Sequence, residues 1–131
     1  MRAPDDQRAS VVREWVAAIH LLKLRASAPT DIVGFHAQQC VEKYLQALLV
    51  WHGLGFPKMH NLVRLFELLP AGFHPEMTPA ERMRLTDFAT ATRYPGDSEP
   101  ITLAEARRAV ALARRVRREW RRWLPRAALK R

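Results

Sequence analysis

The sequence predicts an all-α protein, an up-and-down antiparallel bundle of four long helices and one short helix. Three observations predict this fold class. Apolar residues recur at three- and four-residue spacing, and no stretch alternates as a strand would. Prolines and glycines interrupt the pattern at intervals of about one helix length, and helix-capping residues follow the breaks. We expect one domain over residues 1–131, with its core at about 8–123 and a basic tail at 124–131.

The first two helices are separated by a proline. The first helix is expected from about Asp6 to Ala26 and ends before Pro29, which disfavours helix at the residue preceding it. The second begins at Thr30, which we expect to be its N-cap, and ends near Trp51–Gly53. Apolar residues cover more than one face of this second helix, so several neighbours should bury it. We expect the rest of the chain to be organised around it.

A polar seam interrupts the apolar surface of this central helix. Gln39, Glu42 and Gln46 share one face because they follow each other at helical spacing, and Lys43 lies beside them. One interpretation is an internal hydrogen-bond network, since buried amides and carboxylates need partners. The other is that these side chains face a ligand or a second subunit. The sequence leaves both open.

The remaining helices begin at recognisable caps. A short third helix is expected over 61–69. Thr78–Glu81 is a capping box with proline at the first helical position, and it opens a fourth helix to about Thr92. Thr102–Glu105 is a second capping box, and the final helix runs from there to about Leu124.

The net charge of +9 is concentrated in the last helix and the tail. Residues 1–106 carry 11 basic and 12 acidic side chains, whereas residues 107–131 carry 11 basic ones and only Glu119. Such a ridge can follow a nucleic-acid backbone, meet an acidic protein, or simply keep the outer face solvated. The candidate patch consists of Arg107, Arg114, Arg118, Arg121 and Arg122.

Composition favours a cytoplasmic protein without a metal or other cofactor. No apolar run is long enough to span a bilayer, and the first residues contain no apolar signal segment. Cys40 is the single cysteine and lies in the apolar central helix, as a buried thiol in a reducing compartment would. His36 and Cys40 have a spacing that could hold a metal, but no second pair accompanies them. A core histidine and a buried thiol are the favoured interpretation.

Three motifs in a fixed order resemble the HEPN domain family (higher eukaryotes and prokaryotes nucleotide-binding domain). They are FHAQQCVEKYLQALL at 35–49, GLGFPKMHNLVRL at 53–65 and ATRYPG at 91–96, followed by a long final helix. The resemblance covers about residues 8–123. It implies a helical bundle, frequent homodimers and roles in nucleotide or RNA biology. Many such proteins look like partners of small nucleotidyltransferases in two-gene, toxin–antitoxin-like modules.

The ribonuclease members of that family carry an arginine followed, after four to six residues, by a histidine. Only Arg13 and His20 fit this spacing here, and they lie in the first helix, whereas the family's motif lies late in the chain. No histidine follows His74. The sequence thus favours the non-nuclease branch, a nucleotide-binding or interaction module. The alternatives are a ribonuclease toxin, or an RNA-binding scaffold that uses the basic helix.

Two loop segments offer nucleotide-binding candidates. Arg93 and Tyr94 place a guanidinium for phosphate next to a ring that can stack on a base. Lys58 and His60 precede the short third helix, whose first N–H groups can receive an anion. The alternative is structural: Arg93 caps a helix, Tyr94 packs on the bundle, and Asn61 is an ordinary N-cap. We also expect a homodimer formed through the central and final helices.

Overall fold

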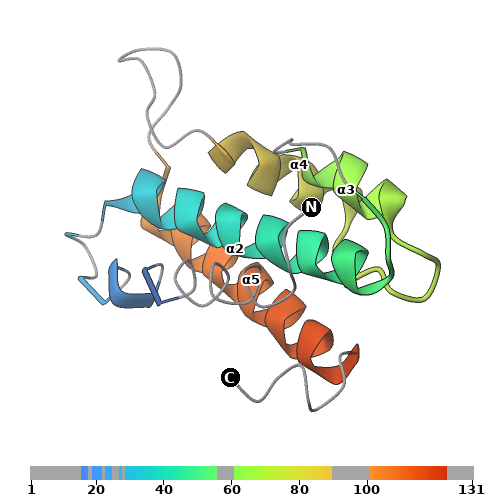
Figure 1. Cartoon of the computed structure of the whole chain (residues 1–131). Coiled ribbons are helices and arrows are strands. Elements are labelled where there is room, and N and C mark those ends of the chain that lie inside the picture. Colours follow the sequence, from blue (N-terminus) through green and yellow to red (C-terminus); the bar gives the residue numbers. More distant parts are fainter. Residues whose placement is uncertain are drawn as a thin grey trace.

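The computed structural model describes residues 16–17, 19–21, 23–24, 27, 29–55, 61–89 and 101–123. Residues 16–17 and 19–21 are helical and belong to the expected first helix. The later helices are α2 (Thr30–Trp51), α3 (Leu62–Leu68), α4 (Pro79–Thr86) with the 3-10 turn η2 (Asp87–Ala89), and α5 (Leu103–Trp123) (Figure 1). No strand occurs within these ranges. The predicted all-helical fold is confirmed.

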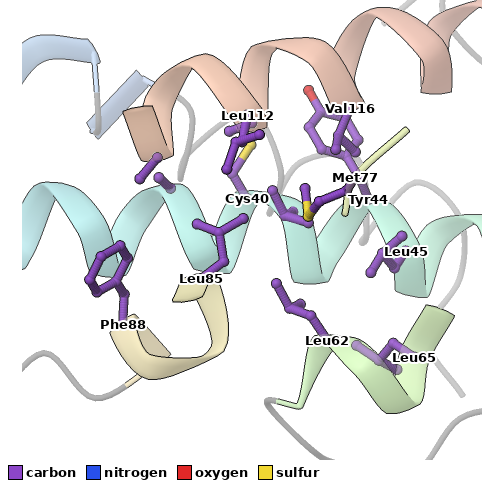
Figure 2. Close-up of a cluster of buried hydrophobic side chains, with 14 of the residues drawn as sticks. Cys40, Tyr44, Leu45, Leu62, Leu65, Met77, Leu85, Phe88, Leu112 and Val116 are labelled. Carbon is purple, nitrogen blue, oxygen red and sulfur yellow. The ribbon is translucent and has the colours of Figure 1, made fainter. Parts of the chain in front are cut away.

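Helix α2 is the centre of the bundle, as its apolar surface predicted. Helix α5 packs along one side of it, and α3, α4 and η2 pack along another (Figures 1 and 2). The two long helices run in the same direction, because Thr30 lies beside Ile101 at one end and Tyr44 contacts Trp120 further along. Helix α4 runs the opposite way, which is the order of an up-and-down bundle.

The core lies where these helices meet α2 (Figure 2). Its side chains are fully or almost fully buried, and mutual burial of such apolar surface is the main favourable term in folding. The largest apolar residues with almost no exposed surface are Tyr44, Leu45, Leu48, Leu49, Leu62, Leu65, Phe66, Leu85 and Phe88.

The helix starts follow the predicted caps. The Asn61 side chain accepts a hydrogen bond from the backbone of α3. Thr78 and Glu81 form a reciprocal capping box at α4, with bonds of 3.1 and 2.9 Å. Thr102 and Glu105 do the same at α5, with bonds of 3.1 and 3.3 Å. These local sequence patterns therefore fix where three helices begin.

The prediction that Thr30 caps α2 is wrong. Thr30 is the first residue of the helix, Pro29 precedes it, and no side chain caps this end. The Thr30 hydroxyl instead donates a 2.6 Å hydrogen bond to the carbonyl oxygen of Ile101. The hydroxyl that would have capped the helix locally is therefore bonded to a residue 71 positions away in the sequence.

Helix α4 is α-helical for a shorter stretch than the expected 78–92. It ends at Thr86 and tightens into η2. The Thr86 hydroxyl donates to the carbonyl oxygen of Arg82 at 2.8 Å and accepts from the backbone N–H of Leu62 at 3.1 Å. The hydroxyl links the last turn of α4 to the start of α3. Residues 90–100, which include the rest of the expected helix, lie outside the described part.

Gly34 allows α2 and η2 to approach closely. A Cβ atom at this position would lie 3.2 Å from two ring carbons of Phe88. That distance is shorter than ordinary van der Waals contact, so any side chain here would displace the Phe88 ring. The glycine fixes how deeply η2 sits against α2.

Candidate functional site

Five arginines form an exposed stripe along α5, which we call the arginine face. Each is exposed, and their spacing places them within one half of the helix circumference. At a rise of about 1.5 Å per residue, the stripe extends over about 22 Å. Buried positions of α5, among them Ala109 and Val116, lie on the other side. The face consists of Arg107, Arg114, Arg118, Arg121 and Arg122.

The acidic residues of α5 do not neutralise this face. The carboxylate of Glu105 pairs with Arg84 on α4. The carboxylate of Glu119 accepts a 2.9 Å hydrogen bond from the backbone N–H of Glu76, on the side of the bundle where α4 begins. Within the described ranges, no carboxylate lies within ion-pair distance of Arg107, Arg118, Arg121 or Arg122. The positive charge therefore faces outward.

The C-terminal half of α5 also contains a shallow hollow of about 550 Å³. Its lining is five arginines and one glutamate: Arg115, Arg117, Arg118, Glu119, Arg121 and Arg122. Arg115 is held by the carbonyl oxygen of Glu76 at 3.2 Å and lies 3.9 Å from the carboxylate of Glu81. Five guanidinium groups against one carboxylate give this end of the helix a strongly positive potential.

The polar seam of α2 lies inside the bundle. Gln39, Glu42 and Gln46 are 7, 2 and 6 % exposed, and the neighbouring Gln38 is fully buried. The Gln39 amide donates to the Gln38 side-chain oxygen at 2.7 Å, and the Gln38 amide approaches the Glu42 carboxylate at 3.4 Å. Lys43 is half-buried. A hydrogen-bond network joins members of the seam, and a role toward a ligand or second subunit stays a prediction.

Tyr44 lies on a different face of α2 from the seam, in the contact between α2 and α5. Its ring lies 4.9 Å from that of Trp120, centroid to centroid. Burial raises the pKa of the Tyr44 phenol far above its usual value, and the nearby Cys40 thiol raises it further. Arg117 and Arg121 act in the opposite direction but do not outweigh burial. Tyr44 is therefore a neutral core residue.

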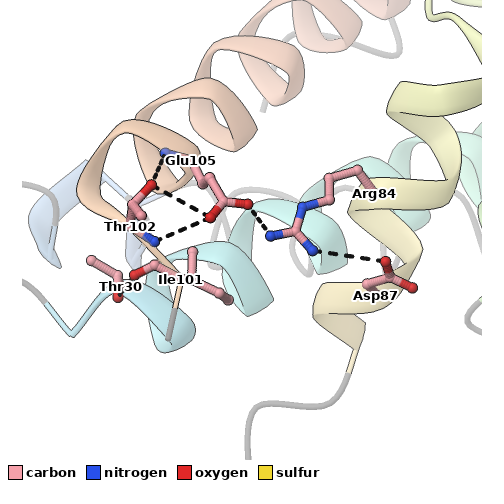
Figure 3. A network of polar contacts seen from close by, with 6 residues as sticks. All are labelled: Thr30, Arg84, Asp87, Ile101, Thr102 and Glu105. Atoms are coloured by element: carbon pink, nitrogen blue, oxygen red, sulfur yellow. Dashed lines mark hydrogen bonds and ion pairs between the residues drawn. The ribbon is translucent and has the colours of Figure 1, made fainter. Parts of the chain in front are cut away.

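Sequence reasoning missed a groove between α4 and α5. It has a volume of about 430 Å³, and its base is apolar. Arg84 spans it by pairing with Glu105 on α5, and the same guanidinium lies 3.8 Å from Asp87 (Figure 3). The lining residues are Thr78, Ala80, Glu81, Arg84, Leu85, Phe88, Glu105, Arg108, Ala109 and Leu112. The sequence signal for the groove is the apolar spacing within each segment: Leu85 and Phe88 on the α4 side, and Leu112 on α5. The same spacing equally predicts a closed core.

The predicted nucleotide-binding residues Lys58, His60, Arg93 and Tyr94 lie outside the described residues. Their flanks are known: Asn61 caps α3, and the segment with Arg93 and Tyr94 connects η2 to Ile101. The role of these residues stays a prediction.

The structure describes both residues of the candidate metal pair, His36 and Cys40. His36 is half-buried with its ring edge-on to Phe35, and Cys40 is buried in the core. No group of three His, Cys, Asp or Glu side chains in this part of the chain is arranged to hold a metal ion.

None of the described helices is both long and apolar enough to cross a bilayer. Of the Arg13–His20 pair, only His20 is described, and it is exposed.

The described helices form a bundle in which α2 carries a buried polar seam and α5 carries an outward arginine face. The HEPN domain family matches residues 17–123, which is most of the chain. The chain belongs to the HEPN domain family. No curated protein and no solved structure matches it.

Proposed function

We propose that this HEPN chain is a non-catalytic nucleotide-binding and interaction module. In this proposal it is the HEPN partner of a small nucleotidyltransferase in a toxin–antitoxin-like pair. The observation that carries the proposal is the arginine face of α5, which is exposed over about 22 Å. The kind of partner is what the resemblance to HEPN proteins implies, and the sequence lacks an Arg–His pair of the ribonuclease spacing late in the chain.

Solvation alone accounts poorly for the arginine face. Arg114 and Arg118, four residues apart, and Arg118 and Arg121, three apart, are like-charged neighbours, each costing about 0.2–0.5 kcal/mol in an isolated helix. Arg121 and Arg122 offset part of this cost because cations near a helix C-terminus gain about 0.3–1 kcal/mol each. Arg107, in the first turns of α5, has no such gain. An acidic surface docked along the whole face would relieve the repulsion.

The proposed docking is electrostatic, so its test is charge-specific. The partner used is the small nucleotidyltransferase encoded beside this chain, and the absence of such a gene would overturn this part of the proposal. Neutralising charges at the edge of an interface mainly slows association and flattens its salt dependence. We expect Arg118→Gln/Arg121→Gln/Arg122→Gln to weaken the complex at least tenfold, about 1.4 kcal/mol.

Two controls separate docking from general charge effects. Arg64→Gln removes an exposed arginine on α3, which pairs with Glu67 at 2.9 Å. It should leave the affinity within twofold. Replacing the same three α5 arginines by lysine keeps the charge and should restore most of the binding if charge dominates.

The nucleotide part of the proposal rests on Arg93 and Tyr94, with Lys58 and His60 as further candidates. Calorimetric titration with ATP at near-physiological salt tests it directly. We expect saturable binding that Arg93→Ala weakens at least tenfold and Arg64→Ala leaves unchanged. Absence of binding, or equal affinity in all three proteins, would refute a nucleotide site at Arg93.

The same proteins discriminate the alternative functions. RNA affinity that falls steeply with salt and depends on the arginine face, without any complex with a nucleotidyltransferase, would favour the RNA-binding scaffold. Metal-independent RNA cleavage that is lost in His20→Ala would favour the ribonuclease. Either result would replace the proposed function.

We further propose that the chain forms a homodimer through α2 and α5. Two copies of the arginine face repel each other, so the dimer must keep this face outside the interface. Sedimentation equilibrium should give twice the chain mass, and a single-chain mass at micromolar concentration would refute the dimer.

A further inference from the structure

We propose that the groove between α4 and α5 binds a small ligand that combines a planar apolar ring system with a single anionic group. None of its lining residues belongs to the arginine face, so the inference goes beyond the partner surface of the proposed function. The groove is open to solvent and has a volume of about 430 Å³, within the range of about 300–1,000 Å³ typical of small-molecule sites.

The base of the groove accounts for the apolar ring. Leu85 and Phe88 come from the α4 side, and Ala109 and Leu112 come from α5. All four residues are 1–5 % exposed, so the base is apolar and closely packed. The Arg84 guanidinium lies 4.7 Å from the centre of the Phe88 ring. A flat ligand can lie on the apolar lining beside the Arg84–Glu105 pair.

The rim of the groove accounts for the single anion. Arg84 already pairs with Glu105 and lies 3.8 Å from Asp87, so its charge is balanced. Arg108 also lines the groove and is exposed. In the described part of the chain it has no ion-pair partner. Among the lining cations, Arg108 is therefore the one available to an anionic group.

The carboxylates of the rim disfavour ligands of high negative charge. Glu81 accepts from the backbone of Thr78 at 2.9 Å and lies 3.9 Å from Arg115, and Glu105 pairs with Arg84. Both carboxylates line the groove. A polyphosphate would bring several negative charges close to them, whereas one anion on Arg108 would be repelled less. The charges thus favour an aromatic carboxylate or a nucleoside monophosphate over a triphosphate.

The test is calorimetric titration of the full chain with 2-naphthoate. We expect saturable binding, with 2-naphthol, which lacks the carboxylate, at least tenfold weaker. Arg108→Ala should weaken 2-naphthoate binding at least tenfold. Arg107→Ala, which removes the same charge from the adjacent position outside the groove, should change it less than twofold. Ala80→Phe, at an exposed position on the rim, should obstruct the groove without disturbing the core.

Competition identifies the source of the anion. AMP that displaces 2-naphthoate more strongly than benzoate does would indicate a nucleoside monophosphate, and the reverse would indicate an aromatic carboxylate. ATP displacing 2-naphthoate better than AMP would overturn the single-anion inference. No saturable 2-naphthoate binding, or equal losses in Arg107→Ala and Arg108→Ala, would overturn the site itself. Arg118→Gln should leave 2-naphthoate binding intact, so this proposal and the partner surface fail independently.

Discussion

Thr30 and Ile101 are joined by a hydrogen bond that sets how the two long helices meet. The Thr30 hydroxyl, at the first residue of α2, donates to the Ile101 carbonyl oxygen at 2.6 Å. Ile101 immediately precedes Thr102, whose side chain caps α5 (Figure 3). The starts of α2 and α5 are thereby held together, and both helices run from this end along the bundle.

Replacing Thr30 by valine should destabilise the protein by about 1–3 kcal/mol, because the carbonyl oxygen of the buried Ile101 loses its donor. Urea unfolding gives the free energy directly. Thr30→Ser keeps the hydroxyl and is the matched control, which should lose less than half as much. Equal losses in the two variants would show that the methyl group, not the hydrogen bond, matters.

Gly34→Ala should destabilise the fold even though alanine favours helix by about 1 kcal/mol over glycine. The new Cβ atom would lie 3.2 Å from the Phe88 ring, and overpacking a core costs about 1–3 kcal/mol. The sign should reverse in a Phe88→Leu background, where the ring is absent. A double-mutant cycle in urea measures this coupling. A coupling energy near zero would contradict the close approach of α2 and η2.

The burial of the Tyr44 phenol should make the protein less stable at alkaline pH. Its pKa is raised by burial in the folded chain, whereas in the unfolded chain it titrates near its ordinary value of about 10. The phenol of Tyr44 therefore holds its proton more tightly in the native state than in the unfolded state. Its contribution to the free energy of unfolding is complete below pH 10 and declines above it. The slope is at most about 1.4 kcal/mol per pH unit.

The measurement is unfolding free energy against pH, with absorbance at 295 nm as a monitor of phenolate. Tyr44→Phe should remove the part of the decline that begins near pH 10. Tyr94→Phe, which removes the other tyrosine, serves as the control. A Tyr44 phenol that ionises near pH 10 while the chain is still folded would contradict its burial.

The sequence was sufficient for the fold because the fold depends on local patterns. Caps such as Thr78 and Thr102 act on backbone groups within three residues, and apolar spacing marks the buried face of each helix. Thr30 shows the limit. Its local pattern was that of an N-cap, and only the three-dimensional position of Ile101 gave the hydroxyl a different partner.

The candidate sites divide in the same way. The arginine face could be read from spacing, since Arg114, Arg118 and Arg121 must share a side of any helix and the structure places them on an exposed one. The α4–α5 groove could not, because it depends on how two helices distant in sequence pack on α2. Whether Arg108 is paired likewise depends on which partners Arg84 and Glu105 take. Contacts between residues far apart in the chain produce no periodic pattern in the sequence.

The most direct test of the proposed function is the affinity of the proposed partner, a small nucleotidyltransferase encoded beside this chain, for two forms of the chain. They are the wild type and Arg118→Gln/Arg121→Gln/Arg122→Gln, compared by calorimetry at two salt concentrations. We predict saturable binding by the wild type that weakens with salt, and at least a tenfold loss in the variant. Undetectable binding by the wild type, or unchanged affinity in the variant, would contradict a partner-binding role for the arginine face of α5.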